Sequence, residues 1–229
     1  MKNILLIGGS HGIGKAIAQK LSPTYKVLAA CRSNEGLQDL DVVHIPFDST
    51  VDSLDIGKLP ELIHGFVYCP GSINLKPFKN LSVETFQSDM ELNFFGLVKV
   101  LKAVLPKMAD GSGLVLFSTV AASVGMPFHS SVAASKGALE GFAKAMAAEY
   151  APKLRFNVIA PSLVDTPLAS RLLGNERKRE LMADRHPLKR IGQDVDIASM
   201  AVFLLGEDSQ WITGQVFGVD GGISTLNIN

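Results

Sequence analysis

The sequence has little of what several classes of protein require. It contains only two cysteines, Cys31 and Cys69, too few for a disulfide-stapled secreted fold or a four-ligand zinc site. No apolar run approaches the roughly 18–20 residues of a membrane span. The first run, residues 4–7, leads directly into glycines and is shorter than the core of a signal peptide.

Charge is also balanced, which excludes further functions. The chain of 229 residues has 22 basic and 22 acidic side chains and a formal net charge of zero. A nucleic-acid binder or a polybasic membrane binder needs a strong cationic surface, and this composition does not provide one. We therefore expect a cytoplasmic protein with a small-molecule substrate, no nucleic-acid or membrane partner and no metal.

Short apolar segments alternate with longer segments of helical periodicity. Strands rich in Ile, Leu, Val and Phe are predicted over residues 3–7, 26–30, 42–45, 65–69, 114–118, 155–159 and 215–219. Helices are predicted over residues 12–21, 83–108, 131–150 and 195–205. This alternation predicts a single Rossmann-like α/β domain over residues 1–229, with a doubly wound parallel sheet of about seven strands.

The first predicted strand ends in a glycine-rich turn that leads into a helix. Glycine allows positive φ and a close approach of backbone to ligand. The unpaired N–H groups at the start of the helix and its positive dipole end suit a pyrophosphate. A purely structural turn is the alternative, but the position between strand and helix favours dinucleotide binding. The predicted contacts are Gly8, Ser10, His11, Gly12, Ile13 and Gly14.

The spacing G-x-x-x-G-x-G resembles that of the short-chain dehydrogenase/reductase family, and further motifs extend the resemblance over nearly the whole chain. They are Leu92-Asn93-Phe94-Phe95-Gly96, Ser118-Thr119 with Lys136, Asn157-Val158-Ile159-Ala160-Pro161 with Thr166, and Thr213-Gly214-Gln215 through Asp220-Gly221-Gly222. The resemblance implies an oxidoreductase that moves hydride between a nicotinamide dinucleotide and a carbonyl, alcohol or enoyl substrate. It also implies a homotetramer or homodimer formed through the helices predicted over residues 83–108 and 131–150.

Further cofactor contacts follow from the same resemblance. It implies that Asp48 contacts the adenine, and the other contacts implied are Ser49, Pro70, Gly71, Pro161, Val164 and Thr166. Residues 32–64 are short for this family. We expect one crossover helix to be reduced to a turn around residues 34–40, and residues 59–64 to be all that remains of the next.

The end of the second strand favours the phosphorylated cofactor. An acid near this point usually bonds the ribose hydroxyls of NAD. Here Cys31 takes its place, followed by Arg32 and Ser33. A guanidinium pairs with a 2′-phosphate, whereas an acid repels it. His11 lies where NADP-linked relatives often have a second basic residue. We therefore expect NADP(H) rather than NAD(H), the alternative being that Arg32 is only a surface arginine.

The family's catalytic pattern is incomplete in this chain. The resemblance implies that Lys136 orients the cofactor ribose, that Thr119 polarises the substrate oxygen in place of serine, and that Asn93 orders a water. Four residues before Lys136, where relatives have the proton-donating tyrosine, this chain has Val132. Valine has no proton to give. The N-N-A-G motif after the fourth strand has become Tyr68-Cys69-Pro70-Gly71.

Three interpretations of Val132 follow. In the first, His129 donates the proton, because seven residues, or two helical turns, separate it from Lys136 and imidazole is a competent acid near neutral pH. A polar loop residue is the bland alternative for His129. In the second, Ser131, Ser130 or a water supplies the proton. In the third, the protein is a non-catalytic, dinucleotide-binding regulator or subunit. The retained positioning residues favour an active oxidoreductase.

Two features bear on the substrate. The most polar stretch, residues 174–189, is either a solvated helix or part of a mobile substrate lid around residues 163–189. Met126, Phe128, Leu163 and Leu168 indicate a partly apolar pocket, suited to a hydrophobic compound.

Overall fold

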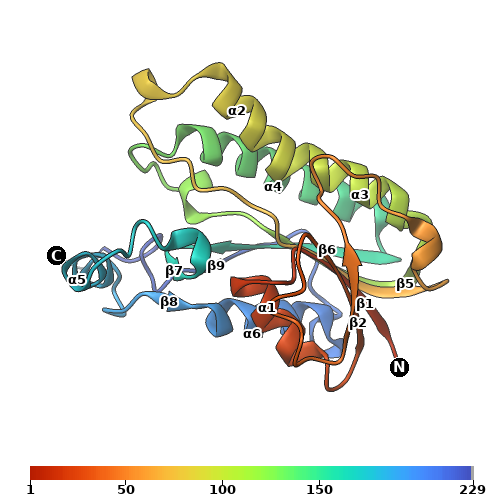
Figure 1. The fold of residues 1–229 in the computed structure, drawn as a ribbon. Coiled ribbons are helices and arrows are strands. Elements are labelled where there is room, and N and C mark those ends of the chain that lie inside the picture. Colours follow the sequence, from red (N-terminus) through yellow and green to blue (C-terminus); the bar gives the residue numbers. More distant parts are fainter. Residues whose placement is uncertain (228–229) are drawn as a thin grey trace.

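The computed structural model describes residues 1–227, which form a seven-stranded parallel sheet with helices on both faces (Figure 1). The order is β3-β2-β1-β4-β5-β6-β9. The bounds are β1 (Asn3–Ile7), β2 (Lys26–Cys31), β3 (Val42–Pro46), β4 (Ile63–Tyr68), β5 (Met108–Phe117), β6 (Leu154–Pro161) and β9 (Val216–Val219). The predicted doubly wound α/β fold is confirmed. The chain reverses its direction across the sheet between β1 and β4, and in such sheets ligands bind in the crevice at this point.

Two groups of helices cover the sheet (Figure 1). On one face lie α1 (Gly12–Leu21) and α6 (Asp194–Leu205), which pack against each other. The other face is covered by α2 (Val83–Met90), α3 (Gly96–Val104) and α4 (Ser130–Tyr150). A separate pair, β7 (Val164–Asp165) and β8 (Gly192–Gln193), flanks α5 (Glu176–Asp184) in the chain. No helix within residues 1–227 is both long and apolar enough to cross a membrane.

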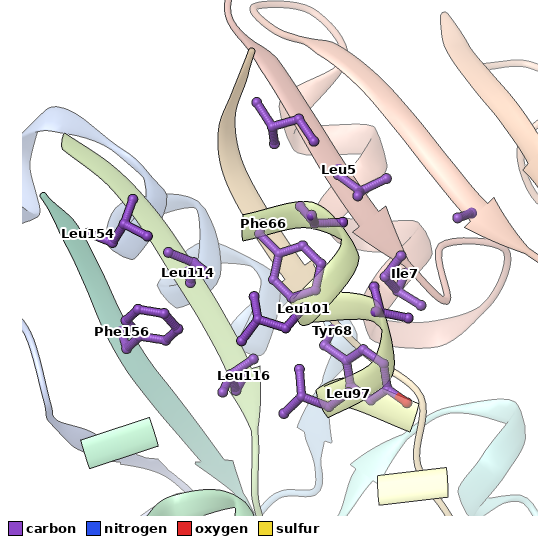
Figure 2. Close-up of a cluster of buried hydrophobic side chains, with 14 of the residues drawn as sticks. Leu5, Ile7, Phe66, Tyr68, Leu97, Leu101, Leu114, Leu116, Leu154 and Phe156 are labelled. Atoms are coloured by element: carbon purple, nitrogen blue, oxygen red, sulfur yellow. The ribbon is translucent and has the colours of Figure 1, made fainter. Parts of the chain in front are cut away.

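Successive side chains of a strand point to opposite faces of the sheet, and so they build one hydrophobic core on each face. In β1, Leu5 and Ile7 face the α3 side, whereas Ile4 and Leu6 face the α1 side, and all four are at most 1% exposed. Figure 2 shows Leu5 and Ile7 beside Phe66 and Tyr68 of β4, with Leu97 and Leu101 of α3 in the same cluster. Each such side chain contributes roughly 1.5–3 kcal/mol by complete burial. The two cores hold the carboxyl ends of the strands in fixed positions.

The helix predicted over residues 83–108 is confirmed as a continuous helical segment over residues 83–107, although it is not one regular α-helix. After α2 the chain makes a wider π-helical turn, Glu91–Phe95, before α3 begins. In this turn, the Leu92 carbonyl accepts a 2.8 Å hydrogen bond from the Tyr68 hydroxyl. The helix then ends in a 3-10 turn containing Pro106, which has no N–H to donate. Met108 is the first residue of β5, so that strand begins earlier than predicted.

Of the two expectations for the short connections between β2 and β4, one is confirmed and one was wrong. Residues 34–40 contain turns and no helix, as expected. The expected helical remnant at residues 59–64 was wrong, because the short helix is Ile56–Lys58 and β4 begins at Ile63. Asp55 fixes this earlier position, since its carboxylate accepts a 3.0 Å hydrogen bond from the Gly57 amide.

Candidate active site

The glycine turn after β1 has the geometry of a phosphate cradle. Gly8 and Gly12 have φ values of 82° and 50°, which favour glycine. A Cβ on Gly14 would lie 2.1 Å from the Gly8 carbonyl oxygen, so α1 starts directly against the turn. His11 precedes the helix and makes no side-chain hydrogen bond to it. The amides of the first helical turn have no partners within the helix, and such groups bind anions.

The fold brings two distant segments against this turn. A Cβ on Gly8 would lie 3.2 Å from the Pro70 ring, and one on Gly12 would lie 3.1 Å from Thr166 Cγ2. Pro70 follows β4, and Thr166 follows the β6–β7 segment. Three predicted cofactor-binding segments therefore meet at the crevice between β1 and β4.

A second group of predicted cofactor contacts lies at the ends of β2 and β3. Arg32 is exposed, and Ser33 is half-buried. The Asp48 carboxylate accepts hydrogen bonds of 2.6 and 2.9 Å from the Thr50 hydroxyl and amide. These bonds hold the pKa of Asp48 below its usual value, and the nearby Arg32 charge acts in the same direction. Ser49 is buried.

The segment after β2 also lies on the glycine turn. A Cβ on Gly36 would lie 1.9 Å from the Ser10 carbonyl oxygen. Ser10 is itself buried, and its hydroxyl is 3.0 Å from His11 Nδ1. His11 Nε2 is 3.9 Å from the Glu35 carboxylate. A Cβ on Gly36 would also lie 3.1 Å from Lys15 Cδ, so the basic side chains of His11 and Lys15 and the exposed acid Glu35 lie beside the turn.

A cavity of about 280 Å³ adjoins the glycine turn. Of the predicted site residues, it is lined by Ile13, Gly71, Thr119, His129, Lys136, Pro161, Val164 and Thr166. Met126, Leu163 and Leu168 line it as predicted, whereas Phe128 is 54% exposed and does not. Arg32, Ser33, Asp48 and Ser49 lie outside it. Asn93, predicted as catalytic, also lies outside it. The structure therefore separates this cavity from the expected adenine side.

Lys136 is the buried cation of this cavity. It lies on α4, one turn after Val132, and its Nζ donates a 2.8 Å hydrogen bond to the Phe117 carbonyl. Burial lowers the pKa of Lys136 to about 8, although Cys69 and Asp89 act in the opposite direction. Burial also raises the pKa of the Cys69 thiol to about 12. An ammonium group with a pKa near neutral can both hold a ribose hydroxyl and exchange a proton.

Asn93 lies fully buried in the π-helical turn. Its Nδ2 donates 3.0 Å hydrogen bonds to the hydroxyls of Ser72 and Ser135. Its Oδ1 has no hydrogen-bond partner within residues 1–227. A Cβ on Gly71 would lie 3.6 Å from both Asn93 Oδ1 and Lys136 Nζ. The orphaned oxygen, the ammonium group and the free helix amides fit a nicotinamide dinucleotide and a water beside it.

Thr119 and His129 both line the cavity, from the segment between β5 and α4. Thr119 Oγ1 accepts a 3.3 Å bond from the Ala121 amide, which leaves its hydroxyl hydrogen for another acceptor. His129 is half-buried and precedes α4 rather than lying within it. Its Nδ1 lies 2.7 Å from the Pro127 carbonyl, so that nitrogen carries the hydrogen and Nε2 is left for a ligand.

Several residues of the site were missed by the sequence reasoning. Ser72 lines the cavity and bonds the buried Asp89. Ser162 and His186 also line it, and their Oγ and Nε2 atoms lie 2.9 Å apart. A single sequence contains no motif that marks these residues, because their partners are distant along the chain.

The segment predicted as a lid lies over the cavity. Leu168, Ala169, Leu172 and Met182 contribute apolar walls to it. The segment folds as a short 3-10 turn followed by α5. Whether it opens stays a prediction. Within residues 1–227, no group of His, Cys, Asp and Glu could hold a metal ion.

Comparisons with known proteins find relatives by sequence and by fold. A family model described as enoyl-(acyl carrier protein) reductase matches residues 47–224. A tropinone reductase homolog of Arabidopsis thaliana is 31% identical, over 97% of this chain and 92% of the relative. The inactive 2-(S)-hydroxypropyl-CoM dehydrogenase 2 of Xanthobacter autotrophicus is 36% identical, over 71% of this chain and 74% of its own. The ligand-free aldohexose dehydrogenase of Thermoplasma acidophilum is 28% identical, with a TM-score of 0.89, covering 100% of this chain and 97% of that one.

Proposed function

This chain belongs to the short-chain dehydrogenase/reductase family, and we propose that it moves hydride between NADP(H) and a carbonyl, alcohol or enoyl substrate. Members of the family are oxidoreductases that use a nicotinamide dinucleotide. One observation carries the proposal. A single cavity joins the start of α1 to Gly71, Thr119, Lys136 and Thr166, which come from four different segments.

We assign a separate role to each residue in or beside the cavity. When bound, the nicotinamide supplies or accepts the hydride. Lys136 Nζ, held by the Phe117 carbonyl, would orient the ribose. The Thr119 hydroxyl would polarise the substrate oxygen. Asn93 is fully buried and does not line the cavity, so its Oδ1 would hold a water behind the cavity wall. His129 lines the same cavity and is one candidate for the proton donor.

The substrate proposed is a small hydrophobic compound. Among the lining side chains, Ile73, Leu75, Leu168, Leu172 and Met182 are apolar. Such walls favour an apolar substrate, and a few polar groups near Lys136 would fix its reacting oxygen. The names of the relatives are consistent with a cyclic ketone or an acyl thioester as the substrate class.

NADP(H) is proposed as the cofactor because Arg32 is exposed directly after β2, where its guanidinium would pair with the 2′-phosphate. Arg32→Ala is expected to weaken NADPH binding by roughly 10- to 100-fold, since a charged hydrogen bond contributes about 1.5–3 kcal/mol. NADH lacks the 2′-phosphate, so its affinity should not change. Calorimetric titration of both cofactors measures the difference. Lys20→Ala, in the last turn of α1, is the matched control for charge. An equal loss for NADH would contradict the assignment.

Glu35 provides an independent check of the same assignment. Its carboxylate lies near His11 and would repel a 2′-phosphate. Glu35→Gln is therefore expected to tighten NADPH binding and to leave NADH binding unchanged, measured by the same titration. Weaker NADPH binding in this variant would contradict the placement of the phosphate.

A second candidate is a non-catalytic, dinucleotide-binding regulator or subunit. Val132 favours it, and so does the similarity to the Xanthobacter relative, which is named as inactive. Titration with NADPH and NADP, followed by turnover assays, separates the two functions. The assays use a β-ketoacyl thioester, an enoyl thioester, a cyclic ketone and secondary alcohols. Oxidation of NADPH or reduction of NADP with any of them supports the enzyme. Tight binding without turnover supports the regulator.

The proposed assembly is a homotetramer or homodimer in the cytoplasm. Val83 and Phe95, at the start of α2 and in the π-helical turn, are 68% and 46% exposed. Apolar side chains exposed on long helices mark interaction surfaces. Sedimentation equilibrium is expected to give a mass of two or four chains, and a monomer would contradict this proposal.

A further inference from the structure

A buried carboxylate lies directly behind the cavity wall. Asp89, on α2, is 1% exposed. Its Oδ1 accepts hydrogen bonds of 2.5 Å from Ser72 Oγ and 2.7 Å from Asn74 Nδ2, and its Oδ2 accepts one of 2.5 Å from Ser131 Oγ. No cation lies within 4.0 Å of it in the described part of the chain. The Lys136 ammonium interacts with it only at longer range. Burial of a carboxylate without a cation in direct contact is costly, and such groups are often functional.

Ser72 connects this carboxylate to the cavity. It follows Gly71 after β4 and lines the cavity together with Val132 and Lys136. Its hydroxyl donates to Asp89 and accepts one hydrogen bond from Asn93. A hydroxyl oxygen has two acceptor positions, so one is left for a substrate O–H. Neither Asn74 nor Ser131 lines the cavity. Among the partners of Asp89, only Ser72 reaches the substrate space.

We propose that Ser72 and Asp89 form the proton relay that replaces the missing phenol. The proposal rests on the proposed hydride-transfer function. In alcohol oxidation, the substrate O–H proton passes to Ser72 Oγ, and the Ser72 hydroxyl proton passes to Asp89. The O–H electron pair forms the C=O bond while hydride leaves the carbon for the oxidised nicotinamide ring. In ketone reduction each transfer runs backwards, and the carboxylate regains its proton from solvent.

The direction of the hydrogen bonds in the structure matches this sequence. Ser72 already points its hydrogen at Asp89, so its oxygen is ready to take a proton from the cavity side. Asn93 holds that oxygen in place through Nδ2. Ser131, one residue before Val132, instead donates to the far oxygen of Asp89. Ser131 lies outside the cavity, which argues against the interpretation in which Ser131 donates the proton directly to the substrate.

Four variants test the relay in the intact protein. Ser72→Ala and Asp89→Asn are expected to lower kcat by about 10²-fold or more, which is the usual contribution of acid–base catalysis. The Kd for NADPH should stay within about threefold of the wild-type value, because neither residue binds the cofactor. The substrate KM should change less than kcat, since proton transfer is lost chiefly in the transition state. Ser72→Thr restores the hydroxyl and should recover most of the activity. Ser88→Ala removes an exposed hydroxyl beside Asp89 on α2, which bonds the Thr85 carbonyl and not the carboxylate, and should keep kcat.

Infrared difference spectroscopy adds a readout that does not depend on rate. Mixing the wild type with NADP and a turned-over alcohol should produce a protonated-carboxyl band that is absent in Asp89→Asn. A purely structural Asp89 would give no such band. Circular dichroism checks folding, and Ser72→Ala, which changes only the cavity wall, decides the question if Asp89→Asn does not fold.

The outcomes separate the relay from the reaction itself. Wild-type turnover with full activity in Ser72→Ala overturns the relay alone. Loss of activity in His129→Ala with Ser72→Ala intact assigns the proton to the histidine and also overturns it. An equal loss in Ser88→Ala would show that kcat responds to any change in this part of α2, and would also overturn the relay. NADPH binding without any wild-type turnover overturns the proposed reaction together with the relay.

Discussion

Replacing Gly14 with alanine is expected to raise the Kd for NADPH by roughly 100-fold or more. Misplacement of a binding group by about 1 Å has effects of this size. The new Cβ would lie 2.1 Å from the Gly8 carbonyl oxygen, a contact that the turn can relieve only by opening. Opening moves the amides of the first turn of α1 away from the phosphates. Stability should also fall by about 1–3 kcal/mol from overpacking. Calorimetric titration and urea denaturation measure the two effects.

Gly141 supplies the matched control. It lies in the interior of α4, where a Cβ would meet nothing within 4 Å. Gly141→Ala should raise stability by up to about 1 kcal/mol through helix propensity and should leave NADPH affinity unchanged. If Gly14→Ala binds NADPH as the wild type does, the glycine turn is not the phosphate site.

The difference in free energy of unfolding between the wild type and Lys136→Met is expected to change by about 3 kcal/mol with pH. The reason is that the pKa of Lys136 falls from 10.5 to about 8 on folding. Between these values the unfolded chain binds more protons than the folded one, so this group adds stability as pH rises. The wild type should therefore gain on the variant by this amount between about pH 7 and pH 10.5. Urea denaturation of both proteins across this range measures the difference.

The control for this prediction is Lys144→Met, which removes an exposed lysine from the same helix. It should show no comparable pH-dependent difference from the wild type, since no burial opposes its charge. If the free energies of unfolding of Lys136→Met and the wild type differ by an amount that stays constant with pH, Lys136 is not desolvated in the folded protein. The ribose-orienting ammonium would then lack the environment described for it.

The sequence was sufficient for the sheet and for the glycine turn. Strands such as Asn3–Ile7 are apolar on both faces, and Gly8, Gly12 and Gly14 occupy positions that require no side chain. These signals are local, and local signals can be read from one sequence. Lys136 and Thr119 were found for a different reason, namely their spacing within a family motif.

Features that depend on distant contacts were not predictable. The π-helical turn is tied to a hydrogen bond between Tyr68 and Leu92, on different elements. Helical periodicity alone therefore extended one helix through it. The partners of Asp89 come from the loop after β4 and from α4, so its burial has no trace in the sequence around it. The proposed proton relay depends on these contacts.

Transfer of deuterium from the cofactor tests the central claim most directly. The protein is incubated with NADPH carrying deuterium at the reactive ring carbon and with each carbonyl and enoyl compound of the panel. Mass spectrometry is expected to find one deuterium on a carbon of the reduced product. Recovery of every compound unlabelled, with the cofactor bound but not oxidised, would contradict hydride transfer by this protein.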